Sequence, residues 1–279
     1  MGIIVGLCAA ACFGSGDFLG GRASRDAPTP VVLFVAQLSA ALGAVVLVLV
    51  FAGSPIGVDL AYGAGAGLLN VIGLGLLYQG LATGRMGVVA PTAAVVAAVI
   101  PVIWGLATGE QPGTLVVVGV AVAVIAGGLI SRETGEVGGG PVSRSVVTAL
   151  CAGVGLGASL VLYAKTGSDS GLWPVLSARI VAVGAAAVAI LVVSRSEPIR
   201  LGAIPRRLAI IAGVFDVGAS AFLLYGVRND LTVVVAPIAA LGPGFTVMLA
   251  WKLLHEPVSR VQVVGLALAL VGLALIAAG

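Results

Sequence analysis

Long apolar runs, separated by short polar connections, occupy the chain from end to end. Runs such as 88–107 and 231–251 are nearly continuous in hydrophobic residues and do not alternate with polar ones. A helix needs about 20 mostly apolar residues to cross a membrane, whereas a membrane β-barrel would show alternation with a period of two. The pattern therefore predicts ten transmembrane helices, at 2–21, 30–52, 60–82, 87–107, 113–131, 145–165, 172–193, 208–227, 231–251 and 260–278.

The same pattern divides the chain nearly in half. The polar connection 132–144 separates a first repeat, 1–131, from a second repeat, 145–279, each with five predicted helices. An odd number of spans makes the second repeat enter the membrane from the opposite side, so the repeats are predicted to be inverted, with a substrate site between them near the midplane. Polar and proline positions recur in one order: Pro30 with Pro174, Asn70 with Asp216, Pro91 with Pro237, and Glu110 with Glu256.

Composition narrows the class of protein further. Hydrophobic residues make up 60% of the chain and 42 more residues are glycine, while charged residues are only 9%, against about 25% in soluble domains. A soluble domain of this size needs more polar surface, which excludes a soluble enzyme, a nucleic-acid-binding protein and a disordered chain. What remains is an all-α polytopic protein of the lipid bilayer. One histidine and three scattered cysteines do not make a common structural zinc site, so no metal or cofactor is expected.

Basic residues are distributed unevenly between the predicted connections. Of the 14 lysines and arginines, all except Lys165, Arg179 and Arg228 fall in odd-numbered connections. The positive-inside rule places such connections in the cytoplasm, which would put both termini outside the cell.

Several motifs of the chain resemble the drug/metabolite transporter superfamily, in its ten-helix branch with two EamA-type repeats. The motifs are Ala90-Pro91 and Ala236-Pro237, Gly109-Glu110 and His255-Glu256, and Phe13-Gly14-Ser15 in the first helix. The chain departs from the family pattern at Val35, which matches Arg179, and at Asp17, where a neutral residue is more common. The resemblance implies a secondary transporter of the bacterial plasma membrane that works by alternating access. It also implies cytoplasmic termini, opposite to the charge pattern.

Three ionisable residues lie inside predicted spans, where a charge is costly and often functional. Asp17 is interpreted as a substrate or proton site, or as a structural aspartate paired with a hydroxyl or an arginine. Arg179 is interpreted as a counter-charge for Asp216 or Asp17, or as an anchor for a substrate carboxylate. Asp216 and Asn70 occupy matching positions in the repeats, and both are predicted to border one water-accessible pocket; the alternative is an interhelical hydrogen bond.

Five further residues are candidates for lining the pathway. Pro91 and Pro237 interrupt corresponding helices and free backbone carbonyls, unless they lie in first turns, where proline is tolerated. Tyr78 and Tyr225 end helices three and eight and serve either as interfacial anchors or as cavity lining. Ser15 lies close to Asp17 in the first helix.

The sequence thus predicts a secondary transporter, without catalytic residues, that exports small amphipathic metabolites or amino-acid-like compounds, with proton coupling left open. A cationic drug exporter that uses Asp17 and Asp216 is the alternative within transport. From other classes, a membrane-embedded enzyme would need a nucleophile–base pair or a metal cluster, which His255 alone does not supply. A scaffold that transports nothing would leave the paired polar residues without a purpose.

Overall fold

The computed structural model describes residues 2–51, 53–109, 113–132, 144–193, 202–228, 242–256 and 259–278. These ranges contain helices and no β-strand, so the predicted all-α class is confirmed for the described part of the chain. The elements are α1 (Gly2–Asp26), α2 (Thr29–Val50), α3 (Gly57–Thr83), α4 (Met86–Ala107), α5 (Thr114–Arg132), α6 (Arg144–Tyr163), η1 (Ser168–Ser170), α7 (Trp173–Val193), α8 (Ala203–Arg228), α10 (Gly242–Leu254) and α11 (Arg260–Ala278).

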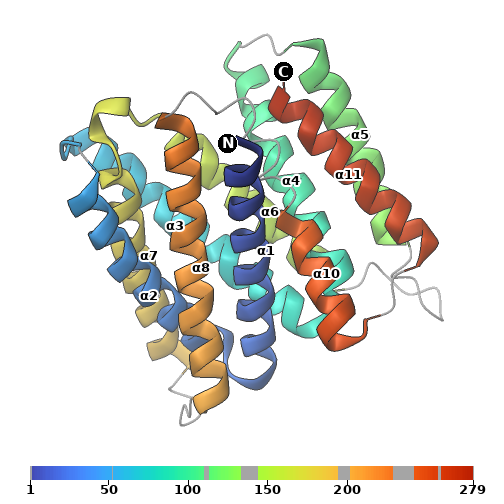
Figure 1. Cartoon of the computed structure of the whole chain (residues 1–279), viewed down its shortest axis with the longest axis horizontal. Coiled ribbons are helices and arrows are strands. Elements are labelled where there is room, and N and C mark those ends of the chain that lie inside the picture. Colours follow the sequence, from blue (N-terminus) through green and yellow to red (C-terminus); the bar gives the residue numbers. More distant parts are fainter. Residues whose placement is uncertain are drawn as a thin grey trace.

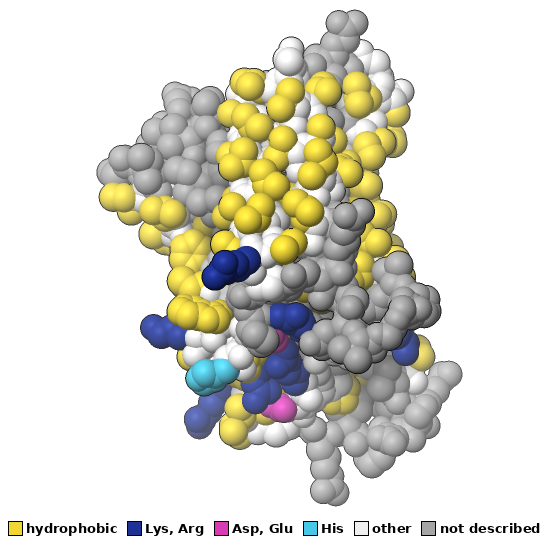
Figure 2. Space-filling view, turned by 90° about the vertical axis from the view of Figure 1, so that its right-hand side faces the viewer, with side chains coloured by type: hydrophobic (Ala, Val, Ile, Leu, Met, Phe, Trp, Pro, Cys, Tyr) yellow, Lys and Arg dark blue, Asp and Glu magenta, His cyan; other side chains and the backbone are white. Residues whose placement is uncertain are grey.

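The helices form a bundle with both termini at the same end (Figure 1). Six helices, α1 to α4, α6 and α7, are long and apolar enough to cross a membrane by length and composition. Large side chains such as Leu42 and Leu49 are 65% and 81% exposed, and Figure 2 shows a broad band of hydrophobic side chains on one face. Such surfaces suit acyl chains rather than water, and the chain is a multi-pass integral membrane protein. The count of ten spans remains a prediction.

Two of the described helix boundaries differ from the predicted ones by five residues. Helix α1 continues to Asp26, beyond the predicted end at 21, because Arg22 and Asp26 form an ion pair four residues apart that supports a further turn. Helix α8 begins at Ala203 rather than at 208, since Pro205 is accommodated in its first turn. In both cases the helix extends past the apolar run that marked it in the sequence.

The helices of the two predicted repeats pack against each other in matched pairs. Helix α1 packs on α8 as α6 packs on α3, and α2 packs on α8 as α7 packs on α3. Likewise α1 packs on α10 as α6 packs on α4, while α5 and α11 pair with each other. These contacts between the halves are unchanged when the repeats are exchanged, as a two-fold relation requires, whereas the packing of α1 on α3 within the first half has no comparable counterpart between α6 and α8 in the described ranges. The contacts between the halves support the predicted repeat, whose inversion in a membrane remains a prediction.

Two glycines at matching positions allow these close helix contacts. A Cβ atom on Gly67 would lie 2.2 Å from the backbone oxygen of Ala178, and one on Gly213 would lie 2.2 Å from that of Ala36. No side chain fits at such a distance, so α3 meets α7, and α8 meets α2, backbone against backbone.

A second correspondence concerns the ends of α4 and α10. Gly109 and His255 follow these helices and both have positive φ, 89° and 55°. The glycine adopts this conformation freely, whereas the histidine is strained in it. The two repeats therefore end these helices in the same way although the residues differ.

Candidate functional site

Two charged side chains from the second half of the chain form an ion pair inside the bundle. The Arg179 Nη1 on α7 lies 2.6 Å from the Asp216 Oδ2 on α8. The arginine side chain is 10% exposed and the aspartate side chain 24%. This pairing is one of the alternatives that the sequence left open for Arg179. It neutralises the charge of Asp216 at short range.

Arg179 is also held by the first half of the chain. Its Nη1 donates a hydrogen bond of 3.1 Å to the Oε1 of Gln37 on α2, and Gln37 is 1% exposed. The Arg179 Nε is buried and has no acceptor among the described residues. The guanidinium therefore joins α2, α7 and α8, and one of its donors remains for a further acceptor.

Asp17 on α1 is the second carboxylate of this site. It lies close enough to Asp216 for the two charges to interact, and it is partly exposed. Within the described ranges its carboxylate has neither an ion pair nor a hydrogen bond. Because Arg179 compensates Asp216, Asp17 is the carboxylate whose charge is left without a counter-charge here.

Two tyrosines complete the cluster. Tyr78 on α3 interacts electrostatically with Asp17, Asp216 and Arg179, and its side chain is only 2% exposed. That burial does not fit interfacial anchoring, and the lining of the pathway by Tyr78 remains a prediction. Tyr163 at the end of α6 interacts with Arg179 and Asp216.

Gly20 of α1 makes room for one of these rings. A Cβ atom at this position would lie 2.0 Å from the Cζ of Tyr78. The hydroxyl end of the ring therefore lies against the α1 backbone, one helical turn from Asp17. The absence of a side chain at Gly20 thus allows the phenol to approach α1 near the carboxylate. We name the group of Asp17, Gln37, Tyr78, Tyr163, Arg179 and Asp216 the acidic cluster.

The other predicted site residues are not joined to the acidic cluster by a recorded contact. Asn70 is partly buried on α3, and no bond between it and Asp216 is found among the described residues, so their shared pocket remains a prediction. Ser15 is partly buried, two residues before Asp17. The Tyr225 side chain and Pro237 lie outside the residues described.

Pro91 is buried in α4 and lies beyond the first turn. The helix begins at Met86, so Pro91 is its sixth residue, and it lacks the N–H that would bond to the carbonyl of Gly87. The first-turn explanation therefore does not apply to Pro91.

Gln37 and Tyr163 were not singled out from the sequence. Gln37 had a usable signal, since it is an isolated amide in the middle of the apolar run 30–52. Tyr163 had none, because a tyrosine at a predicted helix end is usually an interfacial anchor. Only the packing of α6 against α3 and α4 places it beside Arg179.

Comparison with protein families identifies the half of the chain that carries the ion pair. Residues 143–278, which include Arg179 and Asp216, match the model of the EamA-like transporter family. The second half of the chain is thus similar to EamA-like transporters. The resemblance to the drug/metabolite transporter superfamily is thereby confirmed over these residues. A comparison with curated proteins finds no match to the chain.

At one end of the bundle, an ion pair bridges the two halves of the chain. The Nη2 of Arg25, on the last turn of α1, lies 2.8 Å from the Oε1 of Glu256, which follows α10. The same nitrogen donates to the backbone oxygen of Leu81 at 3.3 Å. The Gly87 N–H in the first turn of α4 donates to the Glu256 Oε2 at 3.4 Å. The Glu256 carboxylate therefore connects the end of α10 to α1 and α4.

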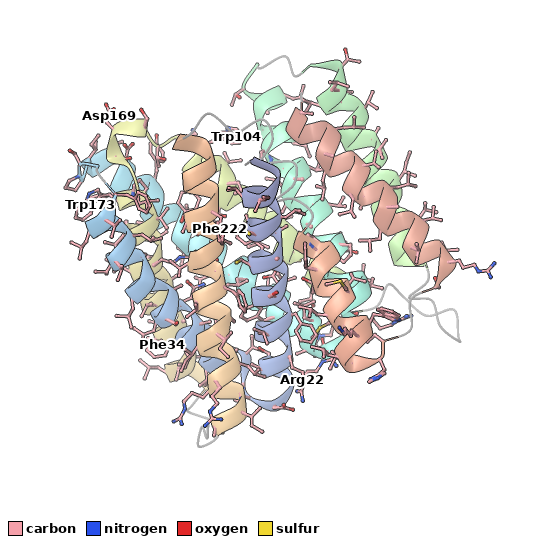
Figure 3. The ribbon with its side chains drawn as sticks, viewed as in Figure 1. Arg22, Phe34, Trp104, Asp169, Trp173 and Phe222 are labelled. Atoms are coloured by element: carbon pink, nitrogen blue, oxygen red, sulfur yellow. The ribbon has the colours of Figure 1, made fainter. Side chains whose placement is uncertain are left out.

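At the opposite end of the bundle, cation–π contacts and a hydrogen bond join the two halves of the chain. The Lys165 Nζ lies 5.1 Å from the centre of the Trp104 ring and 6.0 Å from that of Tyr62. The Gly167 N–H donates to the Asp59 Oδ2 at 3.1 Å. Figure 3 shows Trp104 at this end and Arg22 at the other. Contacts between the halves thus close both ends, on either side of the acidic cluster.

Proposed function

We propose that this EamA-like transporter is a secondary transporter that exports small amphipathic metabolites or amino-acid-like compounds by alternating access. The observation that carries the proposal is the acidic cluster, in which Asp17 lies beside a complete Arg179–Asp216 ion pair. The Arg179–Asp216 pair carries no net charge and could serve a structural role by itself. The additional charge of Asp17 inside the membrane costs several kcal/mol, which a purely structural role would not explain. Binding a proton or a cationic group at Asp17 removes that cost.

The position of the cluster supports the same proposal. Its members come from both halves of the chain, with Asp17, Gln37 and Tyr78 from the first and Arg179 and Asp216 from the second. The matched packing of the helices supports inverted repeats, and transporters of that design bind substrate between the repeats. Rocking one half against the other would then expose the cluster to each side of the membrane in turn.

Transport assays in reconstituted vesicles test this proposal directly. Proteoliposomes with an imposed pH gradient should accumulate amino acids or small amine-bearing compounds faster than protein-free vesicles, and dissipating the gradient should slow the uptake if protons are exchanged. Vesicles that hold the folded protein but move no compound of either class would contradict the proposal.

A cationic drug exporter is the second candidate, because Asp17 has no counter-charge among the described residues. A cationic dye would bind there by charge and by contact with the Tyr78 ring. Competition decides between the two candidates. Inhibition of amino-acid uptake by a cationic dye, without transport of the dye itself, would favour the metabolite exporter.

Alternating access requires each end of the bundle to open, and the Arg25–Glu256 bridge is expected to be broken in one of the two states. We predict that Glu256→Gln shifts the population toward the state that is open at this end, since the ion pair is lost. The measurement is the reaction of a cysteine introduced at Ser24 with an aqueous maleimide, after the three native cysteines are replaced. The rate should rise several-fold.

Asp26→Asn is the matched control for this prediction. It removes a more exposed ion pair at the same end, whose partner, Arg22, lies within α1 itself. The labelling rate should therefore rise much less in this variant than in Glu256→Gln. Equal labelling of Glu256→Gln and the parent protein would show that the bridge does not hold this end closed.

A further inference from the structure

A groove on the flank of the bundle lies apart from the acidic cluster. It encloses a volume of about 500 Å³ between α2, α3 and α7, which is within the range of about 300–1,000 Å³ that holds small ligands. Small residues on two helices create the space, because larger side chains there would fill it. The small lining residues are Gly75 on α3 and Ala185, Ala186 and Ala189 on α7.

The lining of the groove is apolar along most of its length. Leu33 and Val71 contribute aliphatic walls, and the polar lining residues are Thr29 and Gln79. Thr29 is the first residue of α2, and Gln79 lies in the last turns of α3, so both polar groups lie toward the same end of the bundle. The groove therefore has an apolar interior and one polar mouth.

The surroundings of the groove are lipid. All three helices that form it are long and apolar enough to span a membrane. Ile72, which lines the groove, and Val188 beside it are 51% and 61% exposed. Water does not fill an apolar cavity that offers it few hydrogen bonds. An acyl chain from the bilayer is the occupant that matches both the lining and the location.

The polar mouth of the groove opens at the basic end of the bundle. Arg22 on the last turn of α1 is at this end (Figure 3), and Arg206 and Arg207 are exposed in the first turn of α8, which packs on α2. The opposite end carries Asp59 and Asp169. Basic residues at a membrane surface attract anionic lipid headgroups.

We propose that this groove binds an anionic phospholipid, with an acyl chain between α2, α3 and α7 and the headgroup at the basic end. The two walls come from different halves of the chain, α2 and α3 from the first and α7 from the second. The bound lipid would therefore contact both halves at once. The proposal depends only on the membrane location of the protein and not on its transported substrate.

Photocrosslinking tests the proposal in the full-length protein. The protein is reconstituted in phosphatidylcholine vesicles that contain phosphatidylglycerol with a diazirine on its acyl chain. After illumination, peptides from α3 and α7 that line the groove should carry the lipid. Ala189→Phe, which fills the groove, should reduce this labelling several-fold, and a phosphatidylcholine probe of the same acyl structure should label the groove several-fold less than phosphatidylglycerol.

Val188→Phe is the matched control, because it adds the same ring to the neighbouring residue, which is 61% exposed and does not line the groove. Its labelling should equal that of the parent protein. If Ala189→Phe does not fold, Gly75→Val replaces it, since a Cβ atom at this position meets only the flexible end of Leu33, at 3.2 Å. Equal labelling of all variants, equal labelling by both probes, or displacement of the probe by a transported compound would each overturn the proposal.

Discussion

Arg179→Met should destabilise the folded protein strongly and abolish transport. The substitution removes the partner of the Asp216 carboxylate, which lies 2.6 Å from the Arg179 guanidinium inside the bundle. Breaking one side of a buried ion pair typically costs about 3–5 kcal/mol. The loss should appear as a lower midpoint of thermal unfolding in detergent, followed by circular dichroism of the helices.

The double variant Arg179→Met/Asp216→Leu separates the structural role of the pair from its role in transport. Replacing a buried ion pair by apolar residues is often neutral for stability or improves it, so the midpoint should recover while transport remains absent. Arg206→Met is the control, since that arginine is exposed in the first turn of α8. Recovery of transport in the double variant would show that the ion pair stabilises the fold but is not needed for transport.

Asp17→Asn should remove the dependence of transport on a pH gradient while leaving the folded protein in the membrane. The amide keeps the size of the side chain but neither takes up a proton nor carries a charge for an amine to pair with. We expect the gradient-driven rate to fall about tenfold or more, which corresponds to ~1.4 kcal/mol or more. Proteoliposome uptake with and without the gradient measures the effect.

Asp17→Glu is the conservative variant for this experiment, because it retains the carboxyl group beside Tyr78 and Asp216. It should keep the response to the gradient, at a reduced rate if the longer side chain misplaces the charge. If the transport rate of Asp17→Asn depends on the pH gradient as in the parent protein, Asp17 has a structural role and does not carry the coupled proton.

The helices could be located from the sequence because apolar runs of about 20 residues have few other uses. Their ends could not, as α1 shows, since the ion pair of Arg22 with Asp26 extends the helix through polar residues. The similarity of residues 143–278 to a transporter family could also be predicted, because these residues contain Ala236-Pro237 and His255-Glu256, two of the motifs that carry the resemblance. The range 229–241, which holds most of the predicted ninth helix, lies outside the described residues.

The residues of the acidic cluster could be nominated from the sequence, but their partners could not be chosen. One arginine and two aspartates within the predicted spans allow two pairings, and the choice depends on whether α7 faces α8 or α1. Helix periodicity shows which residues share a face and not which helix that face meets. Gln37 was missed for the same reason. Its role rests on the hydrogen bond from Arg179, which forms only because α2 lies next to α7.

The acidic cluster contains two carboxylates and one guanidinium, so one negative charge, at Asp17, is not compensated within it. Under the proposed function, this charge determines whether transport depends on the membrane potential. With Asp216 neutralised by Arg179, the cluster changes its charge through what binds at Asp17. Exchange of one proton for one monovalent cation moves no net charge in a full cycle, so the voltage across the membrane does no work on it. Exchange of a proton for a neutral compound moves one charge, and each 100 mV then contributes about 2.3 kcal/mol. The valence of the cargo would thus decide which component of the proton-motive force drives this protein.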